Sequence, residues 1–200
     1  ALAMLAPAAY GLASGQTGMI HLRGRSGAGK SALANRFLEQ ISAEDDLVVL
    51  SGRCYEQESM PFKALDSVVD SLTRYLISLP EEEVIALLPD RIATLGRIFP
   101  ILTSVKAVKD ESRAEDIPAD PFELRRLGFR VLARLLRKLG EDRRLVLYID
   151  DLQWGDEDSA VFLRDLIQSR RPPRMLFLAG YRSEHRDKSP CLRALPKQET

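Results

Sequence analysis

The chain has 200 residues, of which 45% are hydrophobic and 29% charged, and its 29 Lys and Arg residues balance its 29 Asp and Glu residues. This composition is typical of a globular domain with a substantial core. A formal charge of zero argues against nucleic-acid binding by the whole domain, because a protein that neutralises many phosphates usually carries a basic excess. No stretch reaches the roughly 18 consecutive apolar residues that a membrane-spanning helix needs. We therefore expect neither a nucleic-acid nor a membrane partner.

The two cysteines and the two ends of the chain indicate its compartment and its boundaries. Cys54 and Cys191 have neither CxxC nor metal-ligand spacing, which favours a reducing, cytoplasmic compartment over a disulfide framework or a zinc site. Residues 186–200 are rich in charge and proline, and we interpret them as a tail that leads to a further part of a longer protein. Four apolar residues near the N-terminus recur at helical spacing, which favours a packed helix over a secretion signal: Leu2, Leu5, Ala9 and Leu12.

Short apolar runs alternate with longer amphipathic segments along the chain. In chain order, we predict a strand at 19–22, a helix at 31–41, a strand at 47–50, a helix at 62–79 and a helix at 81–99 that is interrupted near Pro89. The weakly patterned residues 100–121 are predicted to form a surface loop, after which Pro121 opens a helix at 122–139 that Gly140 ends. A strand at 145–149, a helix at 156–169 and a strand at 175–179 complete the series. Strands joined by helical crossovers predict an α/β fold with a parallel sheet, whose carboxyl ends carry the ligand chemistry.

A glycine-rich segment follows the first predicted strand and opens the first predicted helix. It matches the pattern G-x-x-x-x-G-K-[ST], whose glycines let successive backbone N–H groups turn toward an anion at the helix N-terminus. Lys30 is expected to contact the β- and γ-phosphates of a nucleotide, and the Ser31 hydroxyl to bind Mg²⁺. A chance glycine-rich turn is the alternative, which the strand and helix context disfavours. The predicted phosphate loop consists of Gly24, Arg25, Ser26, Gly27, Ala28, Gly29, Lys30 and Ser31.

Two carboxylates, Asp150 and Asp151, directly follow the predicted strand at 145–149. This strand is almost continuously apolar, which is typical of a strand buried on both faces of a parallel sheet. Asp150 is predicted to hold Mg²⁺ through water molecules, because Mg²⁺ keeps much of its hydration shell. Asp151 is predicted to orient or deprotonate the water that attacks the γ-phosphate. A solvated turn at the strand end is the alternative interpretation.

Three segments together resemble the AAA-type ATPase domain of bacterial STAND signalling proteins: GRSGAGKS, LVLYIDDLQWGDEDS and LFLAGYRSEH. Such domains occur in large multidomain Ser/Thr protein kinases, adenylate cyclases and LuxR-like regulators. GRCYEQESMPFKALDSVVDSL and DPFELRRLGFRVLARLL resemble the family more loosely, so the similarity spans nearly the whole chain.

The resemblance implies a P-loop NTPase fold, a three-layer sandwich whose four strands here have the order 1-4-3-2. It implies a Mg²⁺-dependent module that binds and hydrolyses ATP and acts as a nucleotide-dependent switch in a larger regulator or kinase. Its partners would be ATP or ADP, other domains of the same polypeptide and further copies of the chain. The alternative is a scaffold that binds nucleotide without hydrolysis. Because the family has a segment before the first strand, and a fifth strand and a lid after the fourth, we expect residues 1–185 to be an ATPase core truncated at both ends.

The resemblance also assigns a role to Arg182, which ends the fourth strand. At this position, a guanidinium group could sense the γ-phosphate and stabilise the charge of the transferred phosphoryl group. A surface arginine is the alternative.

Trp154 is expected to be a packing anchor and Asp156 to cap the next helix. Two interpretations stay open for Arg53 and Glu56, which follow the predicted strand at 47–50: they face the nucleotide cleft, or they form an ordinary surface pair. His21 and His185 have no nucleophile or metal partner in the sequence, which favours core or surface roles. The basic segment 123–144 is interpreted as a solvated face or a partner surface.

Overall fold

The computed structural model describes residues 17–41, 46–56, 62–111 and 117–196. The chain divides into two compact units, of which the first combines Ala1–Val68 with Gly140–Thr200 and the second comprises Val69–Leu139. Each unit is described by itself. The helix predicted near the N-terminus lies outside the described residues.

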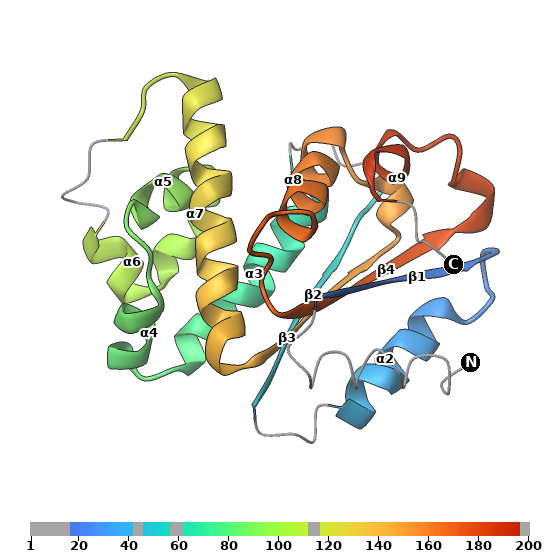
Figure 1. Ribbon diagram of the computed structural model, residues 1–200, viewed down its shortest axis with the longest axis horizontal. Helices are drawn as coiled ribbons and strands as arrows, with labels where there is room; N and C mark the ends of the chain where they lie inside the picture. The colour runs from blue at the N-terminus through green and yellow to red at the C-terminus, as the bar shows by residue number, and fades with distance from the viewer. Residues whose placement is uncertain (1–16, 42–45, 57–61, 112–116, 197–200) are drawn as a thin grey trace. The chain divides into compact units, whose positions relative to one another are not determined.

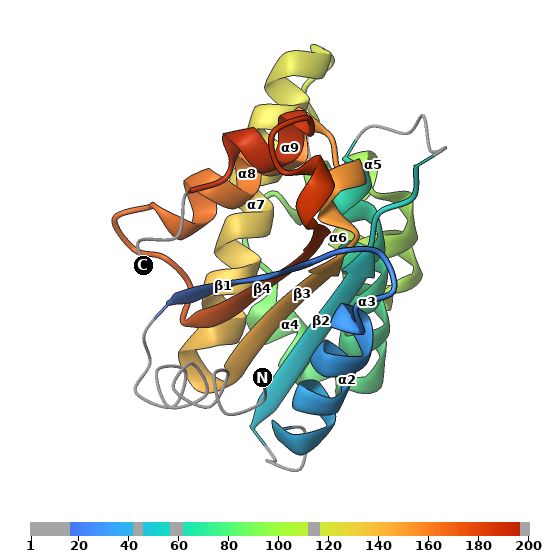
Figure 2. The same cartoon turned by 90° about the vertical axis from the view of Figure 1, so that its right-hand side faces the viewer.

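A four-stranded parallel sheet forms the centre of the first unit. Its strands are β1 (Gly18–Gly24), β2 (Leu47–Arg53), β3 (Arg144–Asp150) and β4 (Met175–Arg182). They lie in the order β1-β4-β3-β2, which confirms the predicted order. All three pairings are parallel, and Gly24 pairs with Arg182 while Arg53 pairs with Asp150. The carboxyl ends of all four strands therefore meet at one edge of the sheet, as Figure 2 shows.

Helices cover both faces of this sheet. Figure 1 shows α2 (Lys30–Ile41) on one side of the strands and α8 (Glu157–Ile167) with α9 (Pro190–Ala194) on the other. The core between α2 and the sheet consists of Leu22, Ala34, Phe37, Leu38, Val146, Tyr148, Leu176 and Leu178. Successive side chains of β3 and β4 are buried on both faces, as the continuous apolar run of 145–149 predicts. The first unit is thus the three-layer α/β sandwich expected from the sequence.

The second unit is helical. It contains the end of α3 (Lys63–Ser78), then α4 (Glu81–Leu87) and α5 (Ile92–Ile98), so the predicted interruption near Pro89 separates two helices. The surface loop predicted at 100–121 is wrong, because η2 (Pro100–Ser104), a 3₁₀-helix, and α6 (Lys106–Glu111) lie within it. Leu102, Val105 and Val108 are buried there. Such short helices are stabilised by the burial of a few side chains rather than by their own propensity, so the sequence pattern is weak.

The long helix α7 (Pro121–Asp142) begins at the predicted proline but continues past Gly140. A Cβ atom at Gly140 would lie 3.0 Å from the carbonyl oxygen of Arg174 and 3.1 Å from its nitrogen. This glycine therefore allows the chain at residue 140, within the first unit, to lie close to the segment before β4, and it does not end the helix.

The segment interpreted as a tail contains the helix α9. Ser189 caps it, since the Ser189 hydroxyl accepts a hydrogen bond from the backbone N–H of Leu192, and Cys191, Leu192 and Leu195 are buried. Across the described ranges of the chain, every helix is too short or too polar to cross a membrane.

Candidate functional site

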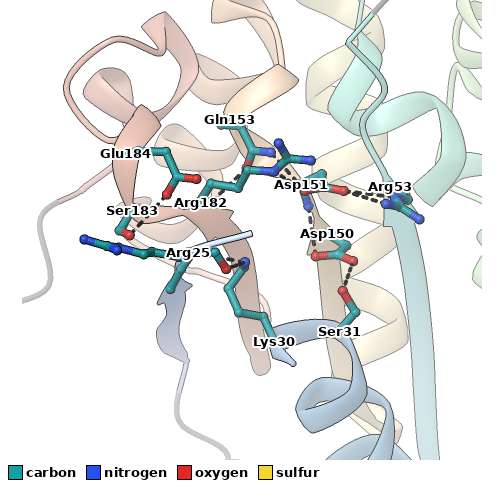
Figure 3. A network of polar contacts seen from close by, with 11 residues as sticks. Arg25, Lys30, Ser31, Arg53, Asp150, Asp151, Gln153, Arg182, Ser183 and Glu184 are labelled. Atoms are coloured by element: carbon teal, nitrogen blue, oxygen red, sulfur yellow. Dashed lines mark hydrogen bonds and ion pairs between the residues drawn. The ribbon is translucent and has the colours of Figure 1, made fainter. Parts of the chain in front are cut away.

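The predicted phosphate loop connects the end of β1 to the start of α2. Gly27 and Gly29 have φ angles of +77° and +80°, a region that residues with a side chain rarely adopt. The loop residues from Arg25 to Gly29 are exposed. Lys30 folds back over this loop, because its Nζ donates hydrogen bonds of 3.1 Å to the carbonyl oxygens of both Gly24 and Arg25 (Figure 3). The loop thus presents an accessible glycine-rich backbone with one ammonium group above it.

Ser31 and Asp150, which are 119 positions apart in the sequence, contact each other directly. The Ser31 hydroxyl donates a hydrogen bond of 2.6 Å to Oδ2 of Asp150, and Oδ1 of Asp150 accepts a bond of 3.0 Å from the backbone N–H of Asp151. Gly180 of β4 makes room for this carboxylate, since a Cβ atom there would lie 2.7 Å from Oδ1. Gly180 is therefore part of the site, although the sequence pattern does not indicate it.

The chemistry of this pair fits Mg²⁺, which prefers oxygen donors and is usually bound by one or two protein groups together with water and phosphate oxygens. Ser31 supplies a hydroxyl and Asp150 a buried carboxylate. In the described part of the chain, no group of three or more His, Cys, Asp or Glu side chains could hold a metal ion. The hydroxyl of Ser31 and the carboxylate of Asp150 are oxygen donors of the kind that Mg²⁺ prefers.

Asp151 lies at the centre of a polar network (Figure 3). Its Oδ2 accepts two hydrogen bonds from Arg53, of 3.0 Å from Nε and 2.7 Å from Nη2. Its Oδ1 accepts a bond of 2.9 Å from Nε2 of Gln153 and lies 3.8 Å from Nε of Arg182. Asp151 itself has a left-handed backbone conformation, with φ at +51°. Both of its carboxylate oxygens are therefore held by neighbouring side chains.

The electrostatic environment keeps Asp151 ionised. Burial by itself would raise the pKa of its carboxyl group, but the hydrogen bonds from Gln153 and Arg53 and the positive charges of Arg53 and Arg182 outweigh this effect. The pKa of Asp151 consequently lies below its usual value. Asp151 is thus a deprotonated carboxylate at neutral pH.

Gln153 joins the ends of β3 and β4. While its Nε2 donates to Asp151, its Oε1 accepts a hydrogen bond of 3.0 Å from the backbone N–H of Arg182. Arg182 thus lies beside Asp151, and its guanidinium carbon is 6.0 Å from the centre of the Trp154 ring. Trp154 also contacts His185, with 4.8 Å between the ring centres. Trp154 therefore packs against the residues that follow β4.

Asp156 caps α8, as the sequence predicts. Its Oδ2 accepts a hydrogen bond of 3.1 Å from the backbone N–H of Ser159, and its Oδ1 accepts one of 2.6 Å from the Ser159 hydroxyl. Asp156 thereby fixes the start of the helix that follows Asp151 and Gln153.

Sequence reasoning missed Gln153 and left Arg53 undecided. Arg53 ends β2, and the register of the sheet places it opposite Asp150. In the order β1-β4-β3-β2, β2 and β3 lie side by side, so their ends are close together. The predicted strand order could therefore have indicated that Arg53 lies near Asp150 and Asp151. Gln153 carries no comparable signal, because its role depends on the short 3₁₀-helix η3 (Leu152–Trp154).

A parallel sheet in this order, with a glycine-rich loop between its first strand and the following helix, defines the class of P-loop nucleotide-binding domains. A comparison with protein families matches residues 1–178 to the AAA ATPase domain. The chain belongs to this family, and its membership indicates nucleotide binding and ATPase activity. A search of curated proteins and a search of solved structures each found no match.

Proposed function

We propose that the chain is a Mg²⁺-dependent ATPase domain that acts as a nucleotide-controlled switch in a larger cytoplasmic signalling protein. The observation that carries this proposal is the 2.6 Å contact between Ser31 and Asp150. It brings two oxygen donors that suit Mg²⁺ to the same end of the sheet as the phosphate loop. The resemblance to STAND signalling ATPases supports the switch role.

Binding would use the loop backbone and three side chains. The loop N–H groups and the Lys30 ammonium would bind the phosphates, while Ser31 and Asp150 would hold Mg²⁺. When bound, the ion would neutralise charge on the phosphate oxygens. Lys30 would exchange its two bonds to the carbonyl oxygens of Gly24 and Arg25 for bonds to phosphate. This exchange would couple the loop to the presence of nucleotide.

Hydrolysis would use Asp151 to accept a proton from the attacking water. The low pKa of Asp151 keeps it in the form that accepts a proton. However, Arg53 covers Oδ2 with two hydrogen bonds, so this oxygen is available to water only when Arg53 moves away. Arg182, beside Asp151, would place its positive charge near the γ-phosphate. Release of Asp151 from Arg53 is thus the step at which nucleotide or a partner domain would control turnover.

A second candidate function is a nucleotide-binding scaffold without hydrolysis. The same Arg53 contact favours it, because a carboxylate held permanently by two hydrogen bonds at one oxygen is a poor acceptor for the proton of water. The two functions share the phosphate loop and differ only in whether Asp151 is released.

The purified chain should bind Mg-ATP and release phosphate slowly. Removal of Mg²⁺ with EDTA should weaken binding and abolish release, because Ser31 and Asp150 would lose the ion that links them to the phosphates. Isothermal titration calorimetry and a phosphate-release assay check the two steps separately. Binding without phosphate release above background would select the scaffold, and equal binding with and without EDTA would contradict the proposed metal site.

Replacing Arg53 with alanine should shift the acid limb of the pH profile of kcat/KM to higher pH. A general base works only when deprotonated, so the rate falls as the pH drops through its pKa. Arg53 is one of the groups that hold the pKa of Asp151 low, so its loss raises that pKa toward the usual value. Arg36→Ala, an exposed site on α2, is the matched control. An unchanged acid limb in Arg53→Ala would mean that the titration of Asp151 does not govern the rate.

A further inference from the structure

The second unit has two adjacent pockets, of about 240 and 320 Å³, which share Glu81 and Ala107 in their linings. The smaller pocket is mainly apolar and is lined by Leu76, Val84 and Val105 among others. The larger one combines apolar side chains with four carboxylates and one arginine, Arg91, so its charged lining is mainly acidic. We call this pair of pockets the acidic hollow, after its acidic residues Glu81, Asp90, Asp110 and Glu111.

Exposed isoleucines border the acidic hollow. Ile77 lines the smaller pocket and is 57% exposed, and Ile85 lines the larger pocket and is 58% exposed. Large apolar side chains that gather around a concave surface are typical of protein interaction sites. Between the pockets, Lys106 pairs with Glu81 at 2.8 Å, and both side chains are at least half exposed. Such an exposed ion pair contributes little to stability, so it can be rearranged at small cost.

The same unit carries a surface of opposite character on α7. Phe122, Arg126, Arg130 and Arg134 are four residues apart, so they share one face of this helix. All four are exposed, and Phe122, at 67%, is the most exposed of the large hydrophobic residues in the described part of the chain. We call this face the basic stripe. It has one aromatic side chain at its start and three arginines along its length.

We propose that the basic stripe of one copy of this chain docks into the acidic hollow of a second copy. The hollow offers apolar pockets edged by carboxylates, and the stripe offers an aromatic ring followed by guanidinium groups, so the two match in both apolar character and charge. Buried aromatic and arginine side chains contribute most of the binding energy at many interfaces, and complementary charge selects the partner.

This association would be heterologous, because the hollow and the stripe consist of different residues. A heterologous contact leaves one free hollow and one free stripe at the ends of each assembly, so it produces rings or open chains rather than closed dimers. It involves neither the phosphate loop nor Asp151. It therefore goes beyond the proposed function, and can hold or fail independently of ATP hydrolysis.

Sedimentation velocity of the 200-residue chain without nucleotide tests the proposal. The wild type should associate in the micromolar range, and salt should weaken this association. Ile85→Lys, which blocks the hollow, and Arg126→Glu/Arg130→Glu, which blocks the stripe, should each be monomeric. A mixture of the two variants should form 1:1 dimers and nothing larger, because only one intact hollow meets one intact stripe.

Three outcomes would overturn the proposal: a wild type that stays monomeric, single-surface variants that associate like the wild type, or a mixture of variants that does not dimerise. Arg36→Glu on α2, outside both surfaces, is the charge-reversal control and should associate like the wild type. If thermal melting shows that one variant is unfolded, Asp110→Lys and Phe122→Ser repeat the same mixing test at other exposed positions.

Discussion

Asp151→Asn should lower phosphate release from Mg-ATP by about 100-fold or more, which is the usual cost of losing a general base. Asparagine has nearly the same shape as aspartate and retains an oxygen acceptor, but its amide cannot take a proton from water. Nucleotide binding should change little, because Asp151 contacts Arg53, Gln153 and Arg182 rather than the phosphate loop. A phosphate-release assay and calorimetric titration with Mg-ATP, carried out on the same preparation, measure the two effects.

The matched control is Asp187→Asn, an exposed aspartate between η4 (Ser183–His185) and α9, which should leave both binding and release unchanged. Thermal melting of each variant separates a loss of chemistry from a loss of folded protein. If Asp151→Asn releases phosphate at the wild-type rate, Asp151 does not accept the proton, and the network around it only organises the ends of β2, β3 and β4.

Local patterns were sufficient to predict the sheet and the loop that opens α2. The run 145–149 contains only apolar and β-favouring side chains, because both faces of β3 are covered. The glycines of the phosphate loop are similarly constrained, since the left-handed backbone at Gly27 and Gly29 excludes most other residues. Strand order, by contrast, came from the resemblance to a family, and no local pattern in the chain encodes it.

The errors concern features that tertiary contacts determine. Residues 100–111 form two short helices because a few side chains, such as Leu102 and Val108, are buried, and so few positions give no recognisable periodicity. Gly140 resembles a helix end in the sequence, but its lack of a side chain serves the close approach to Arg174. The bonds from Arg53 to Asp151 connect positions 98 apart, so no local spacing could predict them. The placement of the glycine-rich loop and of Asp150 and Asp151 at one end of the sheet was thus predictable, whereas the side chains that restrain Asp151 became visible only in the folded chain.

Lys30→Ala should weaken the binding of Mg-ATP by roughly 10- to 150-fold, because a hydrogen bond to a charged group contributes about 1.5–3 kcal/mol. In the structure, the Lys30 ammonium donates hydrogen bonds to the carbonyl oxygens of Gly24 and Arg25. Arg25 is exposed and Gly24 partly exposed, so water can replace the ammonium there. The variant should therefore fold normally while losing affinity, and calorimetric titration with Mg-ATP and thermal melting measure the two properties.

Lys188→Ala, an exposed lysine that follows η4, removes the same charge outside the site and should bind Mg-ATP like the wild type. The comparison also separates Lys30 from Asp151, since one variant should lose binding and the other only turnover. If Lys30→Ala binds Mg-ATP as tightly as Lys188→Ala, the ammonium group does not reach the phosphates. Nucleotide would then be held by the loop backbone alone, and the bonds from Lys30 to Gly24 and Arg25 would be a structural feature of the loop.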